Sequence, residues 1–247
     1  MSFASPSRRA SHPAHAELVH ELGRVARLHA DRGADPALAR RLERLAEWQA
    51  KRLGATYADL AAQARYAEAV IFFQTDLYGS ADFTQRDADL ARIVPVMVRM
   101  LPERVIATVA RAMELNALSQ ELDRALLALL PPGDGAFAVA DYCRAYRGMG
   151  DRPARARQVR LIGEIGAGLD LYVRKPLIAS VLALMRKPAH VAGLGVLHEF
   201  LERGFAAFRK MHGAAEFLAT IDRRERELME AIFAGDDAPF PDPLGGS

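Results

Sequence analysis

Residues 65–102, RYAEAVIFFQTDLYGSADFTQRDADLARIVPVMVRMLP, decide the expected fold. This stretch holds the densest aromatic and apolar run of the chain, interrupted by a break at DLYGSADF (76–83). On both sides of the break, apolar residues recur every three to four positions, which is the spacing of amphipathic helices. We therefore expect two helices to meet at this break, with the rest of the chain packed around them.

The same helical spacing continues outward in both directions. No segment shows the alternation of apolar and polar residues that marks a β-strand, and no internal repeat is evident. The sequence predicts an all-α protein, a single-domain bundle of about eight to ten helices with no sheet. The expected domain covers residues 14–234, with a disordered N-terminus at 1–13, a loose tail at 235–247 and a possible subdomain boundary in the Pro-Gly loop at 131–135.

Capping signals predict where the helices begin and end. Asp35 before Pro36 is an N-cap followed by proline at the first helical position. Gly54 predicts a break or bend, after which Thr56 and Asp59 have capping-box spacing and restart a helix that continues to the next break. Four residues fit helix ends at that second break, with Gly79 as a stop, Asp82 and Thr84 as N-caps, and Asp87 as the partner of Thr84.

The C-terminal half carries two further signals. Gly163, Gly166 and Gly168 lie inside a predicted 153–173 helix, where each costs roughly 1 kcal/mol. We expect them to admit another helix or a flat ligand. Pro176 and Pro188 predict the starts of two more helices, and the second of these, 189–211, carries one stripe made of Leu194, Leu197, His198, Leu201, Phe205 and Phe208.

Length and composition exclude several classes of protein. With 247 residues, of which 51% are hydrophobic, the chain can bury a core without disulfides or a structural metal. The single cysteine, Cys143, cannot form a disulfide within the chain and is expected to be inert packing. No apolar run is long enough for a membrane span, and the N-terminus lacks the apolar core of a secretory signal. A cytoplasmic location is the resulting expectation.

Positive charge gathers between Arg144 and Lys187. That segment contains ten bases against three acids, a net charge of +7, which suits an anionic partner. Only four of the 33 basic residues of the chain are Lys, however, so the segment is equally typical of a compositional bias toward Arg. A solvated helical face and an anion-binding surface both stay open, and nucleic acid is the less expected partner.

The first candidate site is the break, where Asp76, Tyr78 and Arg86 gather. Capping and the helix macrodipole explain acids at a helix start, and they account for Asp82 and Asp87. Asp76, Tyr78 and Arg86 serve no cap and stay as candidate ligand-binding residues. The carboxylate spacing does not match a calcium loop.

Three more candidates lie on predicted apolar stripes. His198 is either a core histidine or a base or metal ligand. Glu225 is expected to pair with an Arg or with His198, because an unpaired buried carboxylate is costly, while a functional raised pKa is the alternative. Asp170, in line with Gly163 and Gly166, poses the same choice.

Familiar catalytic and metal motifs are absent from the sequence. It has no Walker A loop, no Gly-x-Ser-x-Gly elbow, no His-Glu-x-x-His and no Cys pair for zinc. Glu17 and His20 form one Glu-x-x-His pair beside His12 and His15, but a di-iron site needs a second pair. The sequence therefore predicts no metal site and leaves any cofactor unknown.

Three phrases of the sequence resemble those of a known family. They are FFQTDLYGSADFTQRDADLARIVPVM (72–97), MRKPAHVAGLGVLHEFLERGFAAFRKM (185–211) and FLATIDRRE (217–225). They look like those of a bacterial all-helical family of uncharacterised proteins, and the resemblance covers most of the chain from about Leu45 onward. It implies a single cytoplasmic helical domain, and it carries over no activity, ligand or catalytic residue.

Three hypotheses of function follow. The leading one is a non-enzymatic helical binding protein, with an apolar pocket between the 65–101 helices and the helices of Gly166 and His198. Such a pocket takes a small apolar or flat ligand, and a helix face used for self-association as a homodimer is the variant of this hypothesis. The first alternative is a cofactor- or metal-dependent enzyme that uses His198, Glu225 and the Asp76–Arg86 cluster. The second alternative is an anion or nucleic-acid binder through residues 144–187.

Overall fold

The computed structural model describes residues 13–77, 83–132 and 137–245, and within these ranges the chain forms eleven α-helices, one π-helical turn and no strand. The elements are α1 (Pro13–Ala34), α2 (Pro36–Thr56), α3 (Ala58–Ala61), α4 (Ala67–Phe72), η1 (Phe73–Leu77), α5 (Thr84–Met100), α6 (Glu103–Leu129), α7 (Val139–Gly148), α8 (Arg152–Val173), α9 (Pro176–Val191), α10 (Gly195–Lys210) and α11 (Ala215–Ala234). The prediction of an all-α, single-domain bundle is confirmed.

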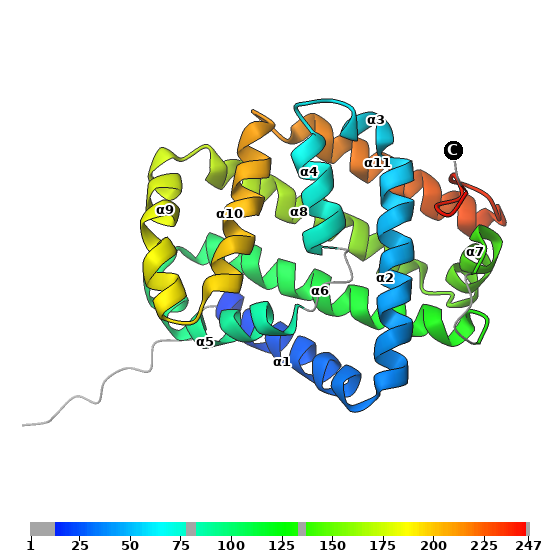
Figure 1. The fold of residues 1–247 in the computed structure, drawn as a ribbon, viewed down its shortest axis with the longest axis horizontal. Coiled ribbons are helices and arrows are strands. Elements are labelled where there is room, and N and C mark those ends of the chain that lie inside the picture. Colours follow the sequence, from blue (N-terminus) through cyan, green and yellow to red (C-terminus); the bar gives the residue numbers. More distant parts are fainter. Residues whose placement is uncertain (1–12, 78–82, 133–136, 246–247) are drawn as a thin grey trace, which may run out of the picture.

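Four long helices form one layer of the bundle (Figure 1). α6 crosses the centre, α1 packs along one side of it and α8 along the other, and α11 packs against α8. α2, α4 and α10 cross this layer on the side turned toward the viewer, and α9 lies beside α10 at the left-hand edge. No described helix combines the length and the apolar content that a membrane span requires.

Buried apolar side chains fill the space between the layer and the crossing helices. One cluster is built around Phe217, one around Trp48 and Tyr142, and one around Leu18. Phe240 belongs to the second cluster, with its ring centre 6.0 Å from that of Trp48. The segment after residue 234, expected to be loose, is therefore anchored to the core at Phe240.

The ends of α2 agree only in part with the capping signals. Asp35 caps α2 as predicted, since its Oδ1 accepts hydrogen bonds from two backbone N–H groups of the first turn. The break or bend predicted at Gly54 comes two residues later, because α2 continues to Thr56 and α3 begins at Ala58. Gly54 instead allows close packing, since a Cβ there would lie 2.7 Å from Gln74 Nε2 of η1.

The predicted single helix from Thr56 to the break is also wrong, and α3, α4 and η1 take its place. Tyr57, not Thr56, holds the N-cap position of α3. Tyr57 and Tyr66 are both buried at the turns around α3, and their hydroxyls donate to Glu225 and to Glu216 of α11. These long-range contacts bend the chain where local spacing predicts a straight helix.

At the second break, α5 begins at Thr84 with Phe83 in the N-cap position, so the predicted Thr84 cap is wrong. The Thr84 hydroxyl instead lies 3.1 Å from His29 Nδ1 of α1. Asp87 does not act as the partner of a cap either, since its carboxylate contacts side chains of other helices. Gly79 and Asp82 lie outside the described residues.

Pro188 does not begin a helix, because it lies inside α9. The turn comes later, at Gly193, whose φ of +70° suits glycine, and α10 then begins at Gly195. Leu201 is exposed and does not belong to the buried stripe of α10.

The glycines of α8 have different uses. A Cβ at Gly166 would collide with the Leu218 side chain of α11, and one at Gly168 would lie 3.0 Å from Thr108 of α6. Gly163 has no such neighbour. Close helix packing is therefore confirmed for Gly166 and Gly168 and is wrong for Gly163.

Candidate functional site

A polar cavity lies inside the bundle where five helices meet. It measures about 50 Å³ and is enclosed by α2, α6, α7, α8 and α11. Its lining is mostly polar and consists of Gln49, Arg52, Ser119, Asp123, Tyr142, Tyr146, Arg155, Gln158, Val159, Ile162 and Glu225. A space of this size holds a few water molecules or a small anion.

Arg155 of α8 is the least satisfied charge in this cavity, and it is only 4% exposed. Its Nη1 donates to Gln158 Oε1 at 3.0 Å, and its guanidinium lies 4.3 Å from the centre of the Tyr146 ring. Its Nε and Nη2 have no hydrogen-bond partner, and no carboxylate of the described residues forms an ion pair with it. A buried charge without a directly paired counter-ion is costly, so Arg155 is the residue of this cavity whose chemistry suits an anion.

Arg52 and Glu225 form the second charged group of the cavity. Arg52 Nη1 donates to Glu225 Oε1 at 2.8 Å, and the Tyr57 hydroxyl donates to the same oxygen at 2.7 Å. Burial alone would raise the pKa of Glu225, but the Arg52 charge and these hydrogen bonds outweigh it and hold that pKa below its usual range. The predicted pairing of Glu225 with an Arg is confirmed, and the alternative of a raised pKa is wrong.

Asp123 behaves in the opposite way. Burial raises the pKa of its carboxyl, and neither the hydrogen bond from Gln49 Nε2 at 2.9 Å nor the nearby Arg155 charge reverses this. Asp123 is therefore a poorer counter-ion than its position suggests. Burial also raises the pKa of the Tyr142 and Tyr146 hydroxyls, which stay neutral.

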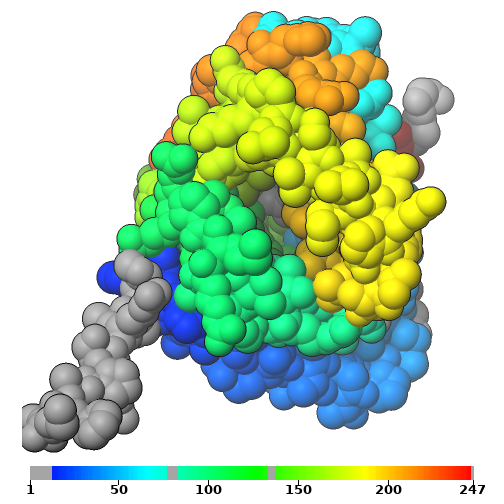
Figure 2. Space-filling view, turned by 90° about the vertical axis from the view of Figure 1, so that its left-hand side faces the viewer, coloured from blue at the N-terminus to red at the C-terminus, as the bar shows by residue number. Residues whose placement is uncertain are grey.

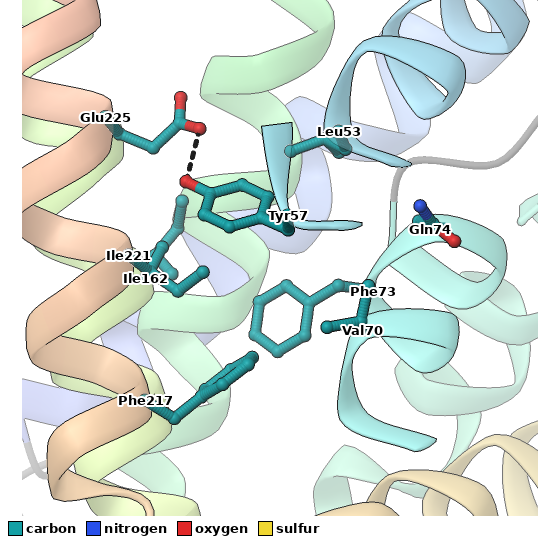
Figure 3. Close-up of a pocket in the computed structure, with 9 residues that line it drawn as sticks. All are labelled: Leu53, Tyr57, Val70, Phe73, Gln74, Ile162, Phe217, Ile221 and Glu225. Atoms are coloured by element: carbon teal, nitrogen blue, oxygen red, sulfur yellow. Dashed lines mark hydrogen bonds between the residues drawn. The ribbon is translucent and has the colours of Figure 1, made fainter. Parts of the chain in front are cut away.

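An apolar cavity of about 30 Å³ adjoins the polar one (Figure 3). Its lining is Leu53, Tyr57, Val70, Phe73, Gln74, Ile162, Phe217, Ile221 and Glu225. Phe73 and Phe217 face each other with ring centres 5.8 Å apart, and the Tyr57–Glu225 hydrogen bond lies at its upper end. Ile162 and Glu225 line both cavities, so the pair forms one site with a charged end and an apolar end.

The position of this apolar cavity agrees in part with the predicted pocket. It lies between α4–η1 and α8, the helix of Gly166, as expected. Two sides come instead from α2 and α11, and none of its lining residues belongs to α10, the helix of His198. Of the predicted site residues, the two cavities bring in only Glu225.

The residues of the break form a separate network. Arg86 donates to Asp87 Oδ1 at 2.9 Å and to the Asp76 carbonyl at 3.3 Å, and its guanidinium lies between the rings of Phe83 and Phe200. The Asp76 carboxylate accepts from Arg203. Tyr78, the third residue predicted here, lies outside the described residues.

Asp87 is the centre of that network. Its Oδ2 lies 3.0 Å from His29 Nε2 and accepts from Asn116 Nδ2 at 2.8 Å. Burial would raise the pKa of Asp87, but the hydrogen bond with His29 and the Arg86 charge outweigh it, so the pKa is lowered. The described groups of this network satisfy one another, which is the pattern of a structural element.

His198 and Asp170 each have a charged neighbour four residues further along the chain. His198 is buried in α10, and its Nε2 lies 3.4 Å from Glu202 Oε1 but makes no hydrogen bond to a described residue. Asp170 pairs with Arg174 at 2.6 Å and accepts from the Ala214 backbone at 3.0 Å, which ties α8 to the start of α11. Within the described ranges, no group of three or more His, Cys, Asp or Glu residues is placed to hold a metal ion.

Most of the basic segment 144–187 is neutralised by ion pairs. They are Arg144 with Asp141, Arg147 with Asp237, Arg152 with Glu230, Arg157 with Glu114 and Glu164, Arg174 with Asp170, and Arg186 with Glu202. Their acidic partners lie on several helices and on the segment after α11, so each of these charges is balanced locally. Arg155 is the member of the segment that turns inward.

Three residues of the polar cavity were not predicted from the sequence: Arg155, Arg52 and Asp123. A signal for Arg155 existed, since it stands four residues before Val159 and seven before Ile162 on the stripe that continues to Gly166. A charged residue on a buried stripe is the informative exception. The net charge of residues 144–187 describes the whole segment and does not distinguish Arg155 from the other bases.

The geometry defines a helical protein with two small adjoining cavities between its helices, one polar and one apolar. The chain belongs to the family described as "Domain of unknown function (DUF8198)", whose model matches residues 28–239 and so includes every residue of both cavities. This match confirms the predicted resemblance to an uncharacterised family. No curated protein and no solved structure shows a significant match to the chain.

Proposed function

We propose that this protein is a non-enzymatic binding protein for a small organic anion, a carboxylate that carries a short apolar or aromatic group. The observation that carries the proposal is Arg155, a buried guanidinium that lines the polar cavity and has two nitrogens, Nε and Nη2, without a hydrogen-bond partner among the described residues. Nε and Nη2 form one edge of the guanidinium, and a carboxylate accepts two parallel hydrogen bonds from such an edge. Glu225 and Asp123 line the same cavity and interact with the Arg155 charge, but neither forms an ion pair with it, so an anion there would supply a counter-ion in direct contact.

The rest of the ligand is indicated by the adjoining cavity. Its apolar walls, with Phe73 and Phe217 at 5.8 Å, suit a compact hydrocarbon or a ring. Both cavities are small, so the proposal excludes drug-sized molecules and long acyl chains. Ile162 and Glu225 are the two residues that line both cavities, and binding would widen the space between them.

A binding role is favoured over catalysis by what lines the polar cavity. That lining contains neither a histidine nor a cysteine, and its ionised carboxylate, Glu225, is held by Arg52 and Tyr57. Cys143 lies elsewhere, and burial raises the pKa of its thiol to about 12, so it is no nucleophile at neutral pH. We place this function in the cytoplasm, as expected for a chain with a single, buried cysteine.

The decisive experiment is native mass spectrometry of the purified full chain, followed by thermal unfolding with three probes, benzoate, hexanoate and inorganic phosphate. We expect benzoate or hexanoate to raise Tm, since a ligand at 100 times its Kd stabilises by about 2.7 kcal/mol. The variant Arg155→Met should lose that response. Arg160→Met, an exposed arginine of the same helix, should keep it.

Two outcomes would contradict the proposal. If no co-purifying mass is found and no probe raises Tm, the polar cavity is a hydrated part of the core. If phosphate alone acts, the apolar cavity takes no part. Self-association as a homodimer rests on a different feature, the exposed apolar side chains of α9, and light scattering of the purified protein tests it independently.

A further inference from the structure

The outer side of α9 is apolar. Of its 16 residues only Ala189 is buried, whereas Leu177 is 75% and Leu184 76% exposed. With 3.6 residues per turn, these two leucines fall on one stripe with the exposed Val181 and Val191. An exposed stripe of large apolar side chains marks an interaction surface.

This stripe does not attach α9 to the rest of the bundle. Ala179, Leu182 and Ala183 face α10 across an open groove of about 370 Å³. These positions lie on the opposite side of the helix from Leu177 and Leu184. The apolar stripe is therefore left over after α9 has packed on its neighbour.

The stripe also lies at the margin of the molecule. α9 forms the left-hand edge in Figure 1, and its axis runs along that edge. Figure 2 looks onto this edge and shows a hollow between α9 and the end of α5. The end of α5 adds three exposed apolar residues, Val96, Met100 and Leu101. A flat surface could therefore meet α9 along its length.

The chain segment that contains α9 carries charge of a single sign, although Glu199, Glu202 and Asp170 lie close to it. Between residues 171 and 198 there are four bases and no Asp or Glu. Two of them, Arg174 and Arg186, pair with acids outside this range, and Lys175 and Lys187 are exposed at the two ends of α9. Packing α9 against α9 of a second copy would bring bases against bases in either orientation, whereas an anionic surface complements them.

We propose that α9 is an interfacial helix that lies flat on an anionic lipid bilayer. Leu177, Val181 and Leu184 would enter the boundary between headgroups and acyl chains, with Lys175 and Lys187 at the lipid phosphates. Binding of this kind is peripheral and reversible. It is independent of the internal cavities, whose residues lie on other helices.

The test is flotation of the full chain with vesicles of phosphatidylcholine alone, or of equal parts phosphatidylcholine and phosphatidylglycerol. We expect flotation with the anionic vesicles, weakened by salt. Changing Leu177→Ser and Leu184→Ser together should weaken it about tenfold or more. The matched control changes two exposed apolar residues elsewhere, Val19→Ser and Ile71→Ser, and should bind normally.

A second pair of changes tests the charge. Lys175→Ala with Lys187→Ala should weaken flotation several-fold and flatten its salt dependence. All variants alter exposed residues, and circular dichroism verifies that they fold. Equal binding to neutral vesicles, or none to either kind, overturns the proposal. The proposal is also overturned if the protein does not float, light scattering shows a dimer, and the double leucine change dissociates that dimer. The stripe is then an interface between copies of the chain.

Discussion

Arg86 and Arg155 are both buried, at 7% and 4% exposure, in opposite surroundings. Arg86 has a carboxylate, a carbonyl and two aromatic rings around it. Arg155 lines a cavity and has one amide oxygen and one ring as partners, and its Nε and Nη2 have no hydrogen-bond partner in the described part of the chain. The difference separates a charge that the fold neutralises itself from one that it leaves without an ion-pair partner, where we propose that a ligand binds. It also predicts how each cluster responds when it is broken.

The largest expected effect is at the satisfied cluster. Asp87→Asn removes the counter-ion of Arg86 and the anionic partner of His29 while keeping the shape of the side chain. Breaking a buried pair costs about 3–5 kcal/mol, so urea unfolding should show a loss of that order. Asp31→Asn, which removes an ion pair of an exposed carboxylate with Arg124, should cost less than about 1 kcal/mol.

The pH dependence of stability should agree. Because the folded pKa of Asp87 is lowered, its contribution is complete above about pH 4, the unfolded value, and is lost as pH falls through the folded pKa. The Asp87→Asn variant should lack this part of the acid loss. An unchanged acid profile would mean that Asp87 is not the organising charge.

A smaller loss is expected at the border of the two cavities. Glu225→Gln leaves a hydrogen-bond acceptor for Tyr57 but removes the charge opposite Arg52. Hydrogen bonds between charged groups contribute about 1.5–3 kcal/mol, so the free energy of unfolding should fall by about 2 kcal/mol. A loss as large as that of Asp87→Asn would show that the Arg52–Glu225 pair stabilises the fold as much as the Arg86–Asp87 pair does.

Arg155→Met should change the unfolding free energy of the ligand-free protein by less than about 1 kcal/mol in either direction, because replacing an unpaired buried charge with an apolar side chain is often neutral or stabilising. Arg86→Met should cost several times more, because it strands the Asp87 carboxylate. Parallel urea titrations of the two variants give the comparison directly. Equal losses would remove the distinction between the two arginines.

The smallest effect is expected at Asp123. Its folded pKa is raised, so ionisation opposes folding, and the stability present below about pH 4 is lost as pH rises through the folded pKa. Asp123→Asn keeps an acceptor for Gln49 and removes that penalty. At pH 7 we expect no change or a gain of up to about 1 kcal/mol. A clear loss at pH 7 would indicate that an ionised Asp123 is the true partner of Arg155.

Helix periodicity predicted the fold class well, because burying one stripe of each amphipathic helix follows from the chain itself. Local capping predicted α2, where Asp35 needs only its own backbone neighbours. It failed around Tyr57 and Thr84, where Glu225 and His29 from distant helices set the geometry. Propensity and capping are weak compared with such tertiary contacts.

The site was less predictable than the fold, because it depends on contacts between helices that are far apart in the sequence. Glu225 and its pairing with an Arg could be predicted, since a carboxylate on an apolar stripe requires a partner. Which Arg it would be, and that Arg155 would have none, depended on how five helices come together. The break was predicted as a candidate site because of its acidic residues, but its described residues form hydrogen bonds with one another and with side chains of neighbouring helices.

The sequence by itself determined that this chain forms a helical bundle and which sides of its helices face inward, because period and composition are local properties. Only the tertiary structure decided which buried charges are paired. The net charge of 144–187 conceals the distinction between Arg155 and its neighbours, since pairing depends on distances between helices that no local pattern records. Arg155 and the outward apolar stripe of α9 have one property in common. Among the described residues, neither has a full set of partners after the helices have packed.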